Sequence, residues 1–344
     1  MKRILLIITL CLVALTGCTS SMNASTVKFG DDLVFVKSGD TYIIDLENST
    51  ELVKSKREEV LQTLVDEETL GDVVGLTTTT ANIFYQMGIM PVGAPESPSL
   101  NMEIASQQYA LEETGAIDKS RVLNVGSALA PNVEAIIELN PQLALYSSAM
   151  PKADYVANLE AGGVNVSSIG QSDYIDMFVL LDVVNELTNF ENSQSTELMN
   201  SMVESLKSTL EIIENADAEE KTVAILLVTE GSINVNNDAT VLGQVSKALG
   251  MKNVFADSEN AELNKEQLLT LNPDYIIYYS HGMGTEAVSN FEAELTSDTS
   301  IYRELDAVKN GQAFQVASED FVFSSSVDFN IIEVIKFLAE KFYA

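Results

Sequence analysis

The chain contains two similar stretches of seventeen residues, 132–148 and 264–280, that lie 132 positions apart. Seven of the seventeen paired positions are identical, in one register without a gap. In both stretches an Asn can cap a short helix, a Glu follows in its first turn, and apolar residues recur at helical spacing. An Asn-Pro pair then ends the helix, because the residue before proline avoids the α region. An apolar strand completes each copy, so the pattern predicts two lobes of similar construction.

Other segments repeat this alternation of strands and helices. Residues 72–76 are predicted to form a short strand, 77–80 the turn into a helix over 81–87, and 89–92 the start of the next strand. This order is typical of βαβ units around a parallel sheet. The apolar residues 222–229 are predicted to form a buried strand that opens the second lobe. We therefore expect an α/β fold with two Rossmann-like lobes.

A helical stretch that lacks Pro and Gly, residues 194–214, predicts a single long rigid helix between the lobes. Two lobes also fit the length of 344 residues, which exceeds what a single core usually supports. Residues 33–46 predict a hairpin and 51–70 a helix, both without a functional interpretation. The predicted organisation is a lipoprotein signal peptide at 1–17, a tether and small N-terminal subdomain at 18–70, a first lobe at 71–190, an interlobe helix at 191–217 and a second lobe at 218–344.

The charge of the chain excludes some partners. It has 19 Lys and Arg against 51 Asp and Glu, which gives a formal net charge of −32. Phosphate binding needs clustered basic residues, so we exclude nucleic acid as a partner. The same charge disfavours tight binding to anionic lipid surfaces.

The N-terminus predicts export. Lys2 and Arg3 precede an apolar run over residues 4–14, which is too short to cross a bilayer and is typical of a signal peptide. The following Leu-Thr-Gly-Cys resembles a bacterial lipobox, which implies cleavage before Cys18 and attachment of lipid, including palmitate, to that residue. An ordinary secretory signal with a chance cysteine is the alternative. We expect an extracytoplasmic monomer anchored to the cell membrane by Cys18, which is then the only cysteine and cannot form a disulfide.

The two similar stretches resemble substrate-binding proteins of bacterial ABC importers, in the class that binds cobalamin, siderophores and haem. The segments Gly-x-x-x-x-Pro-Asn-Val-Glu-Ala-Ile at 126–136 and Glu-Gln-Leu-Leu…Asn-Pro-Asp at 266–274 match that class. The nearest likeness is to haem-receptor lipoproteins of the iron-regulated surface-determinant type, in which a Pro-Asp-Ile-Ile strand also precedes a His-Gly-Met tripeptide, here residues 281–283. The likeness extends from residue 72 to the end. It implies lobes that hardly hinge, haem as a transported ligand for iron uptake, and delivery to a permease and its ATPase.

The only histidine, His281, directly follows the second similar stretch. One histidine without a thiolate partner cannot form a usual zinc site. An imidazole just past a strand can bind haem iron through one ring nitrogen, and the resemblance implies that His281 is this axial ligand. A turn histidine with a hydrogen-bonded ring is the structural alternative.

The second axial ligand departs from the resembled pattern. In those receptors a Met of the other lobe, just before the Pro-Asn-Val-Glu helix, binds the iron, but this chain has Leu129 there, and leucine cannot ligate a metal. Met150, which lies where the strand of the first stretch should open into the cleft, and Met102 are the substitutes, although a Met more often fills a core. Haem held by His281 alone is the remaining option.

Glu134 and Glu266 occupy the same place in the two stretches. A Glu in the first turn of a helix is favoured by the helix dipole at about 0.3–1 kcal/mol, which is a sufficient structural reason for either. The resemblance implies a second role, in which the pair docks onto arginines of the permease.

Several residues are expected to line the ligand cleft. Tyr278 and Tyr279 alternate along a strand, so only one of them can face a ligand. The turn at 77–80 could bind an anionic group through helix N–H groups. The predicted lining is Leu129, Thr78, Thr79, Tyr279, Gly282, Met283, Phe321 and Phe323.

Two other functions are open at this point. The same fold could bind a ferric siderophore or cobalamin without a side-chain ligand to the metal. A lipid-anchored α/β enzyme is more remote, because one histidine and no free thiol leave few groups for acid–base chemistry and no Gly-x-Ser-x-Gly elbow is present. We therefore predict no catalytic residues.

Overall fold

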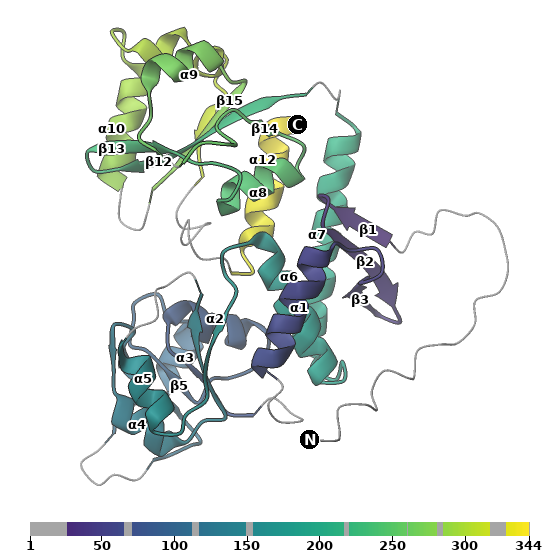
Figure 1. Ribbon diagram of the computed structural model, residues 1–344, viewed down its shortest axis with the longest axis vertical. Coiled ribbons are helices and arrows are strands. Elements are labelled where there is room, and N and C mark those ends of the chain that lie inside the picture. Colours follow the sequence, from purple (N-terminus) through teal and green to yellow (C-terminus); the bar gives the residue numbers. More distant parts are fainter. Residues whose placement is uncertain are drawn as a thin grey trace, which may run out of the picture.

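The structure, a computed structural model, describes residues 26–64, 71–111, 117–148, 154–216, 220–259, 261–280, 285–316 and 328–343. Two α/β lobes lie toward opposite ends of the molecule, and α1 (Glu51–Leu64), α6 (Tyr174–Leu187) and α7 (Ser193–Glu214) lie beside and between them (Figure 1). In this part of the chain no helix is long and apolar enough to cross a membrane.

The first lobe is built on a six-stranded sheet in which the described pairings are parallel. Its strand order is β11-β10-β4-β5-β7-β6, with the bounds Val166–Ile169, Leu143–Ser147, Val73–Gly75, Gly93–Ala94, Val122–Asn124 and Gln108–Tyr109. The helices of this lobe are α2 (Thr78–Gln86), α3 (Met102–Gln107), α4 (Val133–Leu139) and α5 (Asp154–Ala161). Parallel pairing places the carboxyl ends of these strands at one edge of the sheet.

Two predicted boundaries in this lobe are wrong. Helix α2 begins at Thr78 instead of residue 81, because Thr77 and Thr80 form a capping box in which each hydroxyl accepts the other's N–H, at 3.1 and 3.2 Å. The next strand is β5 at Gly93–Ala94 and not residues 89–92. Pro91 has no N–H to offer a neighbouring strand, which explains why pairing begins after it.

The second lobe has a mixed sheet. Its order is β13-β12-β15-β16, with β14 beside β12, and the bounds are Ser232–Val235, Thr222–Thr229, Tyr275–Tyr279, Ala313–Gln315 and Lys252–Asn253. The predicted strand at 222–229 is confirmed, but β13 pairs antiparallel with it after a turn at Gly231, whose φ of +89° favours glycine. The helical elements are α8 (Val241–Ala248), α9 (Lys265–Leu271), α10 (Thr285–Thr296), η1 (Ile301–Glu304), α11 (Asp306–Lys309) and α12 (Ile331–Tyr343).

The two similar stretches fold into the same helix–strand unit, α4–β10 in the first lobe and α9–β15 in the second. Asn132 and Asn264 cap the two helices through their side-chain oxygens, as predicted. Asn140 and Asn272 end them with φ of 49° and 41°. These residues therefore leave the helix in the left-handed conformation, which asparagine tolerates better than most residues.

Residues 26–64 do not form a separate appendage. The strands β1 (Thr26–Phe29), β2 (Leu33–Ser38) and β3 (Thr41–Ile44) make one antiparallel sheet, and the predicted hairpin is its β2–β3 pair. The carboxylate of Asp182 on α6, with an exposed fraction of 6%, accepts hydrogen bonds from the Ile44 N–H and Arg57 Nε, both at 2.9 Å. Burial raises the pKa of Asp182, while Arg57 opposes this shift. The N-terminal segment is thus fastened to the central helices.

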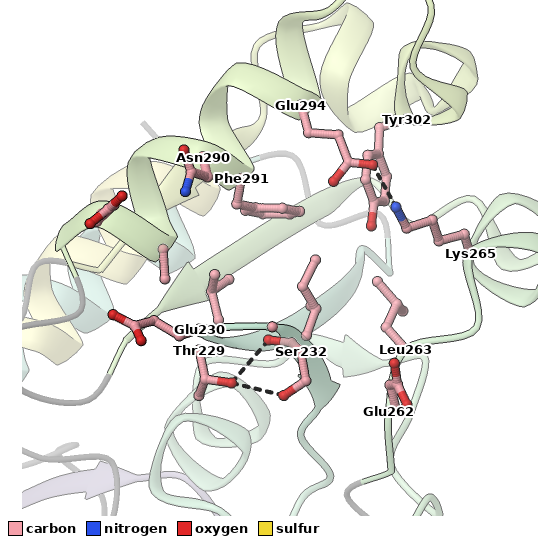
Figure 2. Close-up of a pocket in the computed structure, with 15 residues that line it drawn as sticks. Thr229, Glu230, Ser232, Glu262, Leu263, Lys265, Asn290, Phe291, Glu294 and Tyr302 are labelled. Carbon is pink, nitrogen blue, oxygen red and sulfur yellow. Dashed lines mark hydrogen bonds and ion pairs between the residues drawn. The ribbon is translucent and has the colours of Figure 1, made fainter.

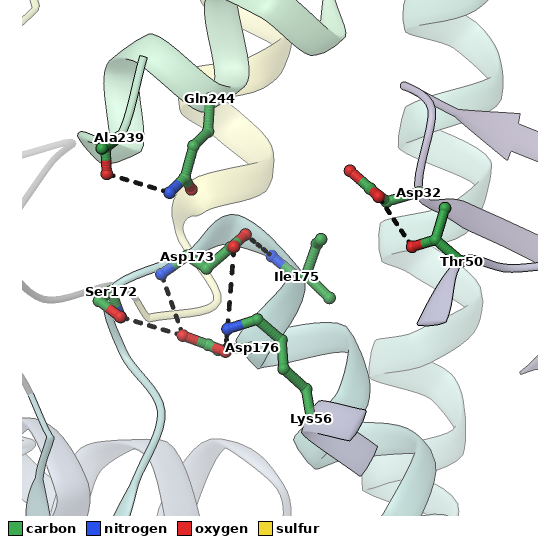
Figure 3. A network of polar contacts seen from close by, with 9 residues as sticks. All are labelled: Asp32, Thr50, Lys56, Ser172, Asp173, Ile175, Asp176, Ala239 and Gln244. Carbon is green, nitrogen blue, oxygen red and sulfur yellow. Dashed lines mark hydrogen bonds and ion pairs between the residues drawn. The ribbon is translucent and has the colours of Figure 1, made fainter. Parts of the chain in front are cut away.

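A polar network joins α1 to the start of α6 (Figure 3). Lys56 Nζ lies 2.6 Å from Asp176 Oδ1 and 3.8 Å from Asp173 Oδ2. The other oxygen of Asp176 accepts the N–H groups of Ser172 and Asp173, both at 3.0 Å. Burial lowers the pKa of Lys56, but the carboxylates of Asp176, Asp173 and Glu59 together outweigh this, so the pKa is raised. The network fixes the place where the chain leaves the first lobe.

One continuous apolar cluster, the central core, links residues 26–64, the central helices and both lobes. It contains Phe35 and Tyr42 of the N-terminal strands, Val203 of α7, Leu145 of β10 and Ile277 of β15, all of them buried. Helix α7 begins one residue before the predicted 194 and ends at the predicted 214. It packs against α6 and α12, so it is not an isolated helix that connects the lobes without other contacts.

Candidate functional site

The ends of the strands define the region in which a ligand is expected. In α/β sheets ligands bind outside the carboxyl ends of the strands. The first lobe presents the end of β10 at Ser147 and the second the end of β15 at Tyr279. These neighbour β4 and β12 in their sheets. The loops that follow these two strands contain most of the residues predicted to coordinate the haem iron.

Seven predicted site residues lie outside the described residues. They are Cys18 near the N-terminus, Met150 two residues after Ser148, His281, Gly282 and Met283 after Ser280, and Phe321 and Phe323. Their roles therefore stay predictions. The described residues fix only where the strands leading to Met150 and His281 end.

The first turn of α2 faces the same edge of the first lobe, because it follows β4 directly. The Thr77 hydroxyl caps the Thr80 N–H, and the Thr80 hydroxyl donates to the Leu145 carbonyl of β10 at 3.1 Å. Thr78 and Thr79 are half-buried in this turn. The first N–H groups of a helix have no acceptor within it, so this turn can bind an anionic group.

Leu129 lies in a hairpin immediately before α4. The short strands β8 (Gly126–Ser127) and β9 (Ala130–Pro131) pair antiparallel, and Leu129 in the turn between them is 81% exposed. Gly126 has φ of +85°, which requires a residue without a Cβ, and the Tyr155 hydroxyl donates to the Ala128 carbonyl at 3.2 Å. The hairpin therefore holds an apolar side chain away from the lobe.

Met102, the other described methionine candidate, is the first residue of α3 and is 82% exposed. Its side chain is not core filler, which was the structural alternative for it. The Asn101 side chain caps this helix at the Glu103 N–H, at 2.9 Å. The exposure leaves Met102 available to a ligand.

The expectation that Tyr279 lines a cleft is wrong for the described structure. Tyr279 is 2% exposed in the central core, where the Asn236 side chain donates to its hydroxyl. Tyr278 points to the other face of the sheet, and its hydroxyl donates to Glu292 Oε1 at 3.0 Å. The two rings alternate as predicted, but β15 lies between β12 and β16 with packed residues on both faces, so both rings are buried.

Glu134 and Glu266 have equivalent places in the two lobes. Each is the second residue of its helix, after a capping Asn, and each is exposed. In Figure 1, α4 lies at the lower end of the first lobe and α9 at the upper end of the second. A partner that contacted both carboxylates would therefore have to span both lobes.

Comparison with known proteins decides the family. A model of the periplasmic binding protein family matches residues 73–319. The chain belongs to the periplasmic binding protein family. The resemblance predicted from residues 126–136 and 266–274 is thereby confirmed.

One protein similar in sequence to this chain is the high-affinity heme uptake system protein IsdE of Staphylococcus aureus. It is 28% identical over 218 residues, which cover 60% of this chain and 70% of that protein. A crystal structure of S. aureus IsdE complexed with heme has a TM-score of 0.54, with 23% identity and coverage of 80% of this chain and 99% of that one.

Two other solved structures share the fold. An ABC transporter substrate-binding protein from Listeria monocytogenes EGD-e has a TM-score of 0.61 and 24% identity, and covers 79% of this chain and 98% of that one. The Bacillus subtilis siderophore-binding protein FeuA, complexed with Ferri-Bacillibactin, has a TM-score of 0.53 and 14% identity, and covers 78% and 91%. The predicted α/β fold of the two-lobed binding-protein class is confirmed.

Family membership has direct functional consequences. The chain is an extracytoplasmic substrate-binding protein of an ABC importer and not an enzyme. The question that follows is which substrate it carries.

Proposed function

We propose that this protein captures haem between its lobes and delivers it to an ABC permease. The observation that carries the proposal is the place of the only histidine, because His281 follows Ser280 just past the carboxyl end of β15. A neutral imidazole at this edge can bind haem iron. The relative IsdE, named for heme uptake, supports the same ligand.

The acidic character of the chain makes the binding of haem carboxylates a separate problem. A net charge of −32 repels propionate groups, so neutral donors must hold them. The first turn of α2, with Thr78 and Thr79 half-buried, supplies N–H groups and hydroxyls. We assign the propionate contacts to this turn.

The second axial ligand is Met150 in this proposal. Residue 150 follows β10 as residue 282 follows β15, and these strands belong to equivalent units of the two lobes. Met102, exposed at the start of α3, is the other thioether that the first lobe offers. Leu129 then contacts the porphyrin through its exposed apolar side chain without binding iron.

Membrane attachment and docking complete the proposed role. Cys18 carries the lipid that holds the protein to the outer face of the cell membrane. Glu134 and Glu266 place one exposed carboxylate on each lobe for basic residues of the permease. Exposed charges of this kind mainly set the association rate and the orientation of docking.

A hemin titration of the purified protein tests the proposal. We expect a Soret shift at saturation, with affinity reduced at least about 10-fold in His281→Ala, since even outer-shell changes at metal sites cost about 10–100-fold. Met150→Ala should change the spin state without abolishing binding, whereas Met102→Ala should leave the spin state unchanged. The reverse result would assign the axial position to Met102. In the Met150→Ala background, Leu129→Met should restore a thioether ligand and return the spin state.

Unchanged saturation in His281→Ala would exclude His281 as the ligand. No hemin response at all, together with fluorescence quenching by a ferric siderophore or by cobalamin, would assign the protein to the alternative cargo. The large acidic excess disfavours an anionic catecholate chelate more than a neutral one.

A further inference from the structure

A recess of about 610 Å³ opens in the second lobe between the β12–β13 hairpin and α10 (Figure 2). It lies on the sheet face that packs against α9 and α10, opposite the face that contributes Tyr279 to the central core. Its volume falls in the range of small-molecule sites, which is about 300–1,000 Å³. None of the residues assigned above to haem or to docking lines it.

The recess contains a buried polar group without a partner. Tyr302 of η1 is 1% exposed, and its ring packs edge-on against Phe291 with centroids 5.6 Å apart. Its hydroxyl makes no hydrogen bond within the described residues and points into the recess (Figure 2). Buried hydroxyls are nearly always paired, so this one keeps a hydrogen-bonding capacity that a bound group could use.

An ammonium group already lies at this place. Lys265 Nζ is 2.5 Å from Glu294 Oε1 and 5.0 Å from the centroid of the Tyr302 ring. A carboxylate and an aromatic ring are thus arranged to hold a primary ammonium. The second oxygen of Glu294 stays available to another donor.

The rim of the recess carries an excess of negative charge. Glu230, Glu262 and Glu286 line it, all three are exposed, and none forms an ion pair with a Lys or Arg of the described residues. With Glu294 they make four carboxylates against the single ammonium of Lys265. This charge attracts a cation from solution.

The chemistry of the recess favours an organic cation over a metal ion. No group of three or more metal-ligating side chains occurs in the described part of the chain. The floor is instead apolar, with Val228 and Ile233 from the sheet facing Ala287 and Phe291 from α10. Such a floor suits an alkyl chain between two charged ends.

We propose that this recess binds a small aliphatic diamine or polyamine. One ammonium donates to the Tyr302 hydroxyl oxygen and to Glu294, the alkyl chain packs on Phe291, and the next ammonium meets the carboxylates of Glu230, Glu262 and Glu286. The site is independent of haem binding, so the importer receptor would carry a second, amine-responsive site.

Calorimetric titration of the whole protein with putrescine and spermidine tests this. We expect saturable binding that is tighter for spermidine. Tyr302→Phe, which keeps the ring and removes only the hydroxyl, should weaken it about 10-fold, and Glu294→Gln at least as much, since hydrogen bonds to charged groups are the stronger kind. Glu197→Gln, which removes an exposed carboxylate on α7, is the matched control and should change nothing.

Equal affinity in the wild type, Tyr302→Phe and Glu294→Gln would overturn the proposal, as would no binding of either amine. An equal loss in Glu197→Gln would also overturn it, because it would show general charge attraction. Thermal unfolding checks that Tyr302→Phe stays folded. A hemin titration of the same variants separates this site from the haem proposal, since the haem affinity should not move.

Discussion

The units α4–β10 and α9–β15 have similar sequences and the same local structure, but their surroundings differ. Both helices begin after a capping Asn and end at a left-handed Asn before proline. Strand β10 pairs with β4 and β11 in a parallel sheet, whereas β15 pairs with β12 and β16, and β12 has an antiparallel partner at the sheet edge. All five residues of β15 are buried, whereas Tyr146 in β10 is only half-buried.

The two units share their local structure and differ in what surrounds and follows them. Caps, helix ends and strand registers are set by local sequence, so they recur in both lobes. The two copies differ in the residues that follow the strands, where the chain has Ala149 and Met150 in one lobe but His281 and Gly282 in the other. The antiparallel edge strand β13 lines the recess of the second lobe, and the described pairings of the first sheet are all parallel.

The largest expected effect comes from the equivalent core positions Leu145 and Ile277. Both side chains are completely buried in the central core. Leu145→Ala and Ile277→Ala should each lower the free energy of unfolding by about 2–5 kcal/mol, because each leaves a cavity. Denaturant unfolding followed by circular dichroism measures this.

Since both residues belong to one cluster, each variant should still show a single unfolding transition. Two transitions in either variant would show that the lobes unfold separately, and would contradict the view that Leu145 and Ile277 belong to one cooperative core.

A smaller effect is expected at the left-handed residues Asn140 and Asn272. Replacement by Ala should cost about 1–2 kcal/mol at each, because a Cβ without a compensating polar group is disfavoured there. Asn272→Ala should cost more, since Asn272 also exchanges two hydrogen bonds with Asp306, at 3.0 and 2.8 Å. Gly replacements are the controls, and Asn140→Gly should be nearly neutral. Equal costs at both sites would count against the role of Asp306.

The smallest effect on stability is expected at Glu134 and Glu266. Glu→Gln at either site should cost about 0.3–1 kcal/mol at low salt, because each carboxylate lies in the first turn of its helix. Glu138→Gln, near the end of α4, is the matched control and should have the opposite sign. Under the docking proposal the two variants should also lower stimulation of the permease ATPase while haem affinity stays constant. Full stimulation in the double variant would exclude docking through this pair.

Much of the fold could be predicted because its signals are local. The similar stretches, the strand at 222–229 and the long helix near 194–214 each carry their own caps or unbroken apolar pattern. The predicted start of α2 is three residues late, because a run of threonines is typical of a turn and the capping box becomes clear only in the structure. The packing of residues 26–64 was missed because it depends on partners far along the chain, such as Asp182.

The candidate site was less predictable than the fold. Glu134 and Glu266 could be found because they belong to the helix signals themselves. Tyr279 was misassigned because strand alternation tells which side a ring faces but not what covers that side. The role of Tyr302 could not be predicted from the sequence. Its hydroxyl is buried without a hydrogen-bond partner among the described residues only because Phe291 and Lys265 pack around the ring in the folded structure.

The continuity of the central core through Leu145, Val203 and Ile277 bears on how cargo would be handed over. Separating the two lobes would expose the buried apolar residues of this core to water, which is unfavourable. We therefore expect the protein to keep nearly the same shape with and without a bound ligand. Under the proposed function, a permease would therefore have to distinguish the loaded from the empty protein by the bound haem itself. Under the proposed function, the free energy that releases the haem would then come from nucleotide hydrolysis by the ATPase of the permease, and not from strain stored in the binding protein.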